Sequence, residues 1–355
     1  MNLNIFDTHR LLMAIEEIAR PSTFLRDRYF PHNSEADLFA TNDVLVEYKD
    51  GNKTIAPFVV PRKGGLFIAR ESYTMDTYKP PCIAPSRMLT IDELEVRGFG
   101  EALLTNLTPE QRELAMLLAD VAELDDMITR REEAMASEVL LTNGCVMHHH
   151  ADKVEDSEVK KLQFYNEEAN PAVYTPAVKW NAAGAKILDD LAVMMRTLTS
   201  RGLPATDLIV PTDTAQTFLA DETIQRLLDL RNYNIGEVDP TLIAVNAALI
   251  AKLNVMGRPL NVIVYDETYT ADDGTETPYI PSGYAILTAP GCGRAIYGAV
   301  TQLEQADGRF HTYKGRRVPK YLSDPIDNVR SVTLTSCPIL MPRHKSPWIA
   351  AKVLS

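Results

Sequence analysis

One long helix constrains the fold of this 355-residue chain more than any other feature of its sequence. Thr108 is a good N-cap, Pro109 suits the first helical position, and Gln111 completes a capping box. An apolar stripe then recurs at helical spacing, formed by Leu114, Leu117, Leu118, Val121, Leu124, Ile128, Met135 and Val139. Asn143-Gly144 supplies the stop. The pattern predicts a helix over residues 108–143, roughly 50 Å long at about 1.5 Å per residue. A bundle or coiled coil would need a second long helix of matching pattern, and none follows.

An overlong irregular segment precedes this helix. Residues 61–89 hold short β-prone pieces interrupted by Pro61, Gly64, Gly65, Pro80, Pro81 and Pro85. A connection of this length usually has a task, although a disordered surface loop is the alternative. Upstream, residues 43–60 are predicted to form a hairpin, because two apolar runs flank the turn signal Asp50-Gly51.

The first 34 residues are predicted to form a short helix followed by an arm. Apolar residues recur at helical spacing from Leu11 to Ile18, and Pro21 ends the pattern. The next segment carries aromatic residues between two prolines, Pro21 and Pro31. It packs either on its own domain or on a neighbouring molecule, and the sequence leaves both interpretations open.

The rest of the chain is predicted to be a mixture of strands and shorter helices. Residues 145–180 are irregular and β-prone, whereas residues 181–316 alternate helical segments with strands, as in a compact α/β or α+β unit. Within that unit, the apolar run at residues 241–253 is predicted to be helical or part of a buried turn. The last stretch returns to strands.

Composition excludes several classes of function. The formal net charge of -12 argues against a protein that mainly grips nucleic acid. No apolar run approaches the roughly 20 residues that span a bilayer, and the first ten residues do not resemble a secretory signal. The four cysteines, Cys82, Cys145, Cys292 and Cys337, are widely scattered, so we expect free thiols in a reducing cytoplasm.

No motif predicts a catalytic, cofactor or metal site. His148, His149 and His150 are adjacent, which does not fit a zinc ligand set, and a solvated loop after the helix is favoured. Residues 272–276 lack the ligand spacing of a calcium loop and indicate a hairpin tip. Residues 291–294 indicate a tight turn, because a strand and not a helix follows them. We therefore predict that the chain is not an enzyme.

Charges are segregated along the chain. Arg62, Lys63 and Arg70 lie in the irregular segment, and a second basic group comprises Arg309, Lys314, Arg316, Arg317 and Lys320. The long helix is strongly acidic. Such segregation suits subunits that pair opposite charges across contacts, although ordinary solvated faces explain it as well.

The order of these parts, together with three local segments, resembles a known family. The segments are PRKGG at residues 61–65, YIPSGYAILTAPGCGRAIYG at residues 279–298 and RVPKYLSDPIDNVRSVTLTSCPILM at residues 317–341. They look like the lambda-like phage major capsid protein E family, with the Hong Kong 97-type (HK-97-like) capsid fold. The resemblance covers essentially the whole chain.

The resemblance implies an α+β fold with six parts. These are an N-terminal arm (1–34), a peripheral-domain hairpin (35–56), an extended β-loop (57–89), a peripheral domain (90–180) with its spine helix (108–143), an axial domain (181–316) and C-terminal strands of the peripheral domain (317–355). Residues 271–278 would be the axial tip near the fivefold and sixfold axes, and residues 319–328 would approach threefold junctions. Lys63 is the obvious loop lysine for a covalent cross-link, but nothing identifies its partner, and none is predicted.

It also implies a function, the major capsid protein of a tailed phage. Hexamers and pentamers would form an icosahedral head around double-stranded DNA in the virion, without sequence-specific DNA binding, membrane or cofactor. Expected partners are a scaffold protein, a portal and a decoration protein at threefold sites. Candidate subunit contacts are Phe24, Arg28, Tyr29, Phe30, Arg62, Lys63, Gly64, Gly65, Arg70, Asp273, Lys320 and Asp324. The alternatives are an encapsulin-like cellular shell protein of the same fold and, in a different class, a cytosolic α/β enzyme.

Overall fold

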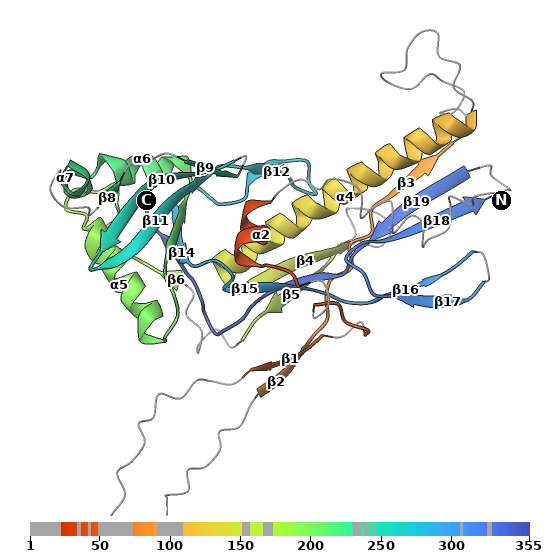
Figure 1. The fold of residues 1–355 in the computed structure, drawn as a ribbon, viewed down its shortest axis with the longest axis horizontal. Coiled ribbons are helices and arrows are strands. Elements are labelled where there is room, and N and C mark those ends of the chain that lie inside the picture. The colour runs from red at the N-terminus through yellow and green to blue at the C-terminus, as the bar shows by residue number, and fades with distance from the viewer. Residues whose placement is uncertain are drawn as a thin grey trace, which may run out of the picture.

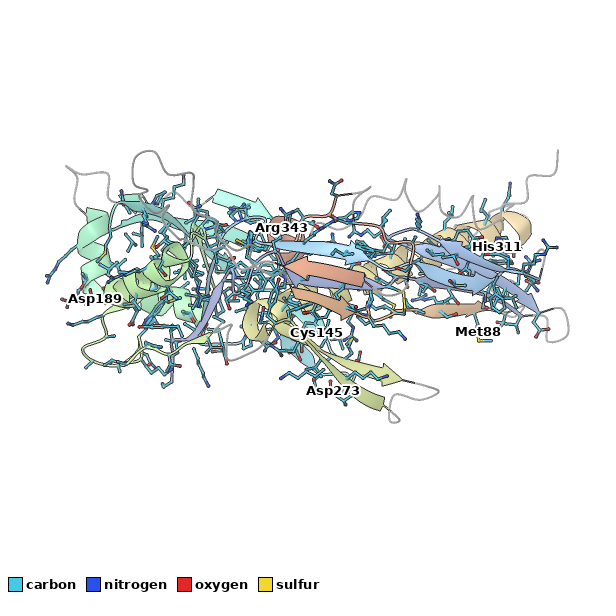
Figure 2. The ribbon with its side chains drawn as sticks, turned by 90° about the horizontal axis from the view of Figure 1, so that it is seen from below. Met88, Cys145, Asp189, Asp273, His311 and Arg343 are labelled. Carbon is cyan, nitrogen blue, oxygen red and sulfur yellow. A yellow bond between two sulfur atoms is a disulfide. The ribbon has the colours of Figure 1, made fainter. Side chains whose placement is uncertain are left out.

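A computed structural model describes residues 23–33, 37–41, 44–48, 74–90, 109–150, 157–165, 173–229, 236–237, 241–244, 246–305, 308–324 and 329–355. The described part is an elongated, flat body (Figures 1 and 2). Helix α4, Pro109–Thr142, runs diagonally along it, as the capping and stripe pattern predicts. The helix ends where Asn143 adopts a positive φ of 57°, a conformation that asparagine tolerates.

A peripheral unit lies along α4 (Figure 1). Its three-stranded antiparallel sheet has the order β18-β19-β3, with β18 Val318–Asp324, β19 Val329–Thr335 and β3 Ser86–Leu89. Apolar residues of α4, Leu117, Val121, Leu124 and Ile128, pack on Val332 and Leu334 of β19. Three antiparallel pairs complete the unit: β15 Gly293–Tyr297 with β20 Pro338–Pro342, β16 Val300–Leu303 with β17 Phe310–Tyr313, and β4 Gly144–His150 with β5 Ser157–Gln163.

An axial unit forms the other end of the body (Figure 1). Its sheet has the order β6-β21-β14-β7-β11-β10-β8, with β9 also pairing β10. The strands are β6 Val173–Tyr174, β21 Ile349–Lys352, β14 Tyr284–Thr288, β7 Asp207–Val210, β11 Arg258–Tyr265, β10 Ala247–Val255, β8 Gly236–Glu237 and β9 Thr241–Ala244. The helices are α5 Ile187–Ser200, α6 Thr212–Ala220 and α7 Glu222–Asp229. The core between sheet and helices includes Leu191, Met194, Phe218 and Val262.

Strand pairing corrects the predicted domain limits. β21 lies within the predicted peripheral strands at 317–355, yet it pairs with β14 in the axial sheet. β6, from the predicted peripheral domain 90–180, pairs in parallel with β21. Conversely, β15 falls in the predicted axial domain 181–316 but pairs with β20 of the peripheral unit. The chain therefore crosses between the units more often than a linear division of the sequence allows.

The predicted hairpin at residues 43–60 lies only partly within the described residues. β1, Val44–Tyr48, pairs antiparallel with β2, Thr74–Tyr78, and residues 49–73 lie between them, outside the described residues. The Asp50-Gly51 turn signal and the second strand of the predicted hairpin fall within this gap. Tyr78 contacts Phe164 with 5.2 Å between ring centroids, which places the end of this pair on the subunit core.

Two further segments are strands where other structures were predicted. The apolar run at residues 241–253 forms β9 and most of β10, whose burial alternates along Ala247–Val255. This alternation is the two-residue period of a strand, and Met256-Gly257, both with positive φ, make the tight turn into β11. His148, His149 and His150 belong to β4, paired with Val159, Glu158 and Ser157, and not to a loop.

The predicted axial tip does lie on a hairpin, but in a different place. β12 Thr268–Thr270 pairs with β13 Glu276–Pro278, and Asp272 in the turn forms an ion pair with Arg131 of α4. The hairpin therefore lies against the spine helix, whereas α7 and β8 occupy the outer end of the axial unit in Figure 1.

The expectation of four free thiols is wrong for two cysteines. Cys82 and Cys337 form a disulfide with a Cα–Cα distance of 4.2 Å, while Cys145 and Cys292 are free and buried. Ile83 pairs with Ser336 next to the bond, so the two cysteines face each other in the antiparallel ladder that continues from β3 and β19. Because 255 residues separate them in sequence, spacing alone could not indicate the pairing.

Candidate functional site

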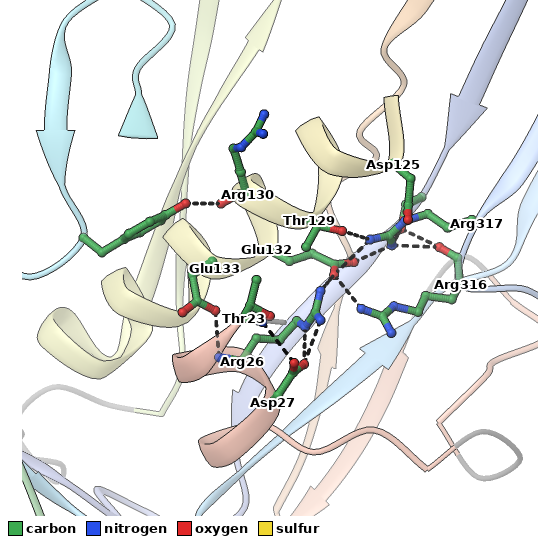
Figure 3. A network of polar contacts seen from close by, with 12 residues as sticks. Thr23, Arg26, Asp27, Asp125, Thr129, Arg130, Glu132, Glu133, Arg316 and Arg317 are labelled. Atoms are coloured by element: carbon green, nitrogen blue, oxygen red, sulfur yellow. Dashed lines mark hydrogen bonds and ion pairs between the residues drawn. The ribbon is translucent and has the colours of Figure 1, made fainter. Parts of the chain in front are cut away.

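A buried network of charges joins the N-terminal segment, the spine helix and the C-terminal strands (Figure 3). The three nitrogens of the Arg317 guanidinium have different partners: Nε donates to Asp125 at 2.5 Å, Nη1 to Glu132 at 2.6 Å and Nη2 to Thr129 at 3.2 Å. Glu132 also accepts from Arg26 of α2, Phe24–Tyr29, at 2.9 Å and from Arg316 at 3.2 Å. We call Arg26, Asp27, Asp125, Glu132, Arg316 and Arg317 the charge cluster.

The charge cluster combines three guanidinium groups with three carboxyl groups, so opposite charges are present in equal number. Burial alone would raise the pKa of Glu132, but Arg317, Arg316 and Arg26 outweigh burial and hold that pKa well below 4.5. Burial acts against the charge of Arg317 too, yet Glu132 raises the pKa of Arg317. A buried ion pair of this kind depends on every partner, because losing one leaves the others buried and uncompensated.

Neighbouring contacts fix α2 to the spine helix. The buried Glu133 carboxylate accepts the backbone N–H groups of Leu25 at 2.7 Å and Arg26 at 2.9 Å, and the Tyr265 hydroxyl at 2.8 Å. Burial raises the pKa of Glu133, although these donors oppose the shift. Two consecutive side chains of α4, Glu132 and Glu133, thus hold the side chain and the backbone of the same short helix.

The same segment reaches the axial sheet. Arg28 donates to Asp207 of β7 at 2.7 Å, and the Tyr29 hydroxyl donates to the same oxygen at 3.2 Å. Asn261 of β11 donates to the other Asp207 oxygen at 3.0 Å, so this fully buried carboxylate is paired on both sides. Residues 23–30 therefore join the peripheral and axial units.

Gly293 allows the end of α2 to pack closely on β15. A Cβ atom at position 293 would lie 2.3 Å from Cδ1 of Phe30, which itself contacts Trp348. We expect Gly293→Ala to lower the free energy of unfolding by about 1–3 kcal/mol, the usual cost of overpacking a core. Urea unfolding of the free subunit measures this. Gly315→Ala is the matched control, because its Cβ meets atoms no closer than 3.5 Å; equal stabilities of the two variants would contradict the packing argument.

The predicted contact residues fall into three groups. Phe24, Tyr29 and Phe30 are buried in the core of their own chain, and Arg28 pairs with Asp207, so the interpretation as a segment that packs on its own domain is right for them. Arg62, Lys63, Gly64, Gly65 and Arg70 lie outside the described residues, as does the predicted helix before Pro21.

Asp273, Lys320 and Asp324 are on the surface of the described part. Asp273 accepts hydrogen bonds from the backbone N–H and the hydroxyl of Thr275 at 2.9 and 2.6 Å. These bonds close the hairpin turn and lower the pKa of the Asp273 carboxyl. Lys320 is half-buried and Asp324 exposed on β18. Arg316 and Arg317 do not belong to a surface patch: they turn inward to the acidic residues of α4. Opposite charges are therefore paired here within one subunit.

Within the described residues there is no group of three or more potential metal-ligating side chains. None of the described helices is long and apolar enough to cross a membrane. Both free cysteines are buried, and burial raises the pKa of each thiol, which disfavours the nucleophilic thiolate.

Comparison with known proteins shows what this arrangement belongs to. A family model described as phage major capsid protein E matches residues 7–353. The chain belongs to this family. It is 21% identical over 368 residues to the major capsid protein of Enterobacteria phage P21, across 99% of this chain and 100% of that protein. The same values hold for the P21 prophage-derived major head protein of Escherichia coli O6:H1 (strain CFT073).

A solved structure bears out the fold. A prophage protein of Escherichia coli CFT073, described as a capsid protein, superimposes with a TM-score of 0.67 over 98% of this chain and 99% of its own, at 17% identity. This phage major capsid protein E family member therefore has the Hong Kong 97-type fold. It is a major capsid protein of a tailed double-stranded DNA phage or prophage, a structural component of the virion and not an enzyme. Capsid proteins of this kind assemble into oligomeric shells.

Proposed function

We propose that this capsid protein assembles as hexamers and pentamers into an icosahedral head around double-stranded DNA. Scaffold, portal and threefold decoration proteins would act with it, and its net charge of -12 suits a wall that does not adhere to DNA. The observation that carries the proposal is the anchoring of β1 and β2. Val44 and Tyr78, at the paired ends of these strands, are buried in the subunit core, and residues 49–73 lie between the other ends. Because these strand ends are fixed in one subunit, the segment that they carry can contact a neighbouring subunit.

The β1–β2 pairing allows most of residues 49–73 to be deleted without changing the rest of the subunit. Replacing residues 51–71 with a short Gly–Ser linker keeps the β1–β2 register, in which Tyr48 faces Thr74. We expect a subunit that unfolds cooperatively at the wild-type denaturant concentration but forms no closed shells, because the contacts to neighbours are lost. Negative-stain electron microscopy and sedimentation measure assembly.

A second variant separates charge from length. Replacing Arg62, Lys63 and Arg70 with alanine keeps the whole segment, and assembly of this variant should weaken while its stability stays unchanged. Closed particles of normal size from the deletion variant would refute the role of residues 49–73 in neighbour contacts.

A further inference from the structure

The peripheral sheet β18-β19-β3 has one protected edge and one open edge within the described residues. At the β18 edge, the Gln305 carboxamide donates to the Ser323 carbonyl at 2.6 Å and accepts the Ser323 N–H at 2.9 Å. Gln302 donates to the carbonyl of Pro319, a residue that has no N–H, at 3.3 Å. Side chains thus occupy the Pro319 carbonyl and both backbone groups of Ser323, with which another strand would pair, and this is a usual protection for a sheet edge.

Among the residues that the structure describes, none gives the β3 edge such protection. Ile83 and Ser336 exchange two backbone hydrogen bonds, at 2.7 and 2.9 Å, and Leu334 donates to Pro85 at 3.1 Å. Because bonding alternates along an antiparallel strand, Arg87 and Leu89 continue the series bonded to β19. Ser86 and Met88 therefore direct their N–H and C=O groups outward, where β3 pairs with no described strand other than β19.

A surface groove begins at this open edge and crosses the sheet, on the face opposite the α4 contact made by Val332. It is lined by the apolar residues Met88, Leu322 and Val329 and by the polar residues Ser86, Gln305, Ser323, Asp324 and Ser331. Met88 is 64% exposed and Leu322 is 38% exposed. Figure 2 shows Met88 at the surface of the peripheral end. An open edge next to apolar side chains is the arrangement that accepts an added strand, with backbone bonds for affinity and the groove for alternate side chains.

We propose that the outer edge of β3 accepts an extended strand from a second copy of this chain. This inference rests on the proposed assembly, because in a shell the surroundings of each subunit are other copies. The protected β18 edge supports it: with one edge closed, strand addition cannot continue through the sheet from copy to copy. Each subunit then receives one strand, and such contacts can close into a finite shell instead of a fibre.

Amide hydrogen exchange tests the proposal residue by residue. Free wild-type subunits and particles assembled from the purified chain alone are compared by mass spectrometry with electron-transfer fragmentation of peptides covering residues 83–90. Exchange at Ser86 and Met88 should slow on the order of a hundredfold on assembly, because a bonded amide exchanges only after local opening. Arg87 and Leu89, already bonded to β19, serve as internal controls and should be slow in both states.

A matched pair of variants tests the groove. Met88→Lys places a charge in it, whereas Met256→Lys changes a methionine that is 82% exposed in the β10–β11 turn. Only Met88→Lys should raise the critical concentration for assembly, by about tenfold if roughly 1.4 kcal/mol is lost. Unfolding of the free subunits should be the same for both.

The outcomes are distinguishable. Particles in which Ser86 and Met88 stay fast, or in which Met88→Lys assembles like Met256→Lys, overturn this inference and leave the proposed function intact. Protection that arises only when another phage protein is added assigns the edge to that protein and also overturns it. Failure of the wild-type chain to form any shell, alone or with a scaffold protein, overturns the proposed function and this inference together.

Discussion

Glu132→Gln should lower the free energy of unfolding of the subunit by about 3–5 kcal/mol, the usual result of removing one partner from a buried ion pair. The substitution preserves shape but removes the charge shared by Arg26, Arg316 and Arg317, and all of these groups except part of Arg316 are withdrawn from water. Because the cluster joins α2, α4 and the start of β18, the loss should appear as one cooperative shift in guanidinium unfolding. Shell yield should fall with it.

The control is Glu123→Gln on the same helix. Glu123 pairs with Arg87 at the surface, where its side chain is 59% exposed, and such a pair contributes about 0–1 kcal/mol. Equal losses in the free energy of unfolding would show that the charge cluster stabilises the subunit no more than a surface ion pair does.

The pH dependence of the free energy of unfolding tests the role of Glu132 in a second way. The arginines lower the pKa of Glu132 in the folded subunit, so its contribution is fully present above the ordinary value of 4.5 and is lost as the pH falls below it. The stability difference between wild type and Glu132→Gln should therefore narrow from pH 5 toward pH 3. A difference that stays constant over that range would mean that Glu132 is not ionised in the cluster.

Local signals made the spine helix predictable. Pro109 begins it and Asn143 ends it, and its stripe includes the residues that contact Val332 and Leu334. The charge cluster could not be predicted from the sequence, because Glu132 and Arg317 are 185 residues apart and only the fold brings them together. The sequence did show an acidic helix and a basic segment, but that pattern fits contacts within a subunit as well as between subunits.

The wrong predictions have physical reasons as well. A short apolar run such as residues 241–253 fits a buried helix or a strand, and its partner β11 decides in favour of the strand. No local signal indicated that β1 pairs with β2, because partner residues such as Val44 and Tyr78 lie far apart in the sequence. Whether Phe24 and Phe30 pack on their own domain or on a neighbour could not be decided from the sequence, because their burial depends on Tyr265 and Trp348, which lie far along the chain.

Removing the disulfide bond between Cys82 and Cys337 should also lower the free energy of unfolding by a large amount. The bond closes a loop of 255 residues, and constraining so long a loop in the unfolded chain stabilises a protein by about 2–5 kcal/mol. We expect Cys82→Ser with Cys337→Ser to unfold at lower denaturant than the oxidised wild type, and at the same denaturant as the wild type reduced with dithiothreitol. Dithiothreitol should not change the double variant, which makes that variant its own control.

Thiol counting decides whether the bond forms. Alkylation of the unfolded chain should label two cysteines, Cys145 and Cys292, in the oxidised wild type and four after reduction. Four labelled cysteines before reduction would refute the bond.

Because a bacterial cytoplasm keeps thiols reduced, the subunit should carry four thiols during assembly and two in released particles. The bond joins the segment between β2 and β3 to the segment between β19 and β20, close to the open β3 edge. Oxidation should therefore raise the heat resistance of finished shells without being needed to build them, so the double variant should assemble at normal yield into particles that melt earlier.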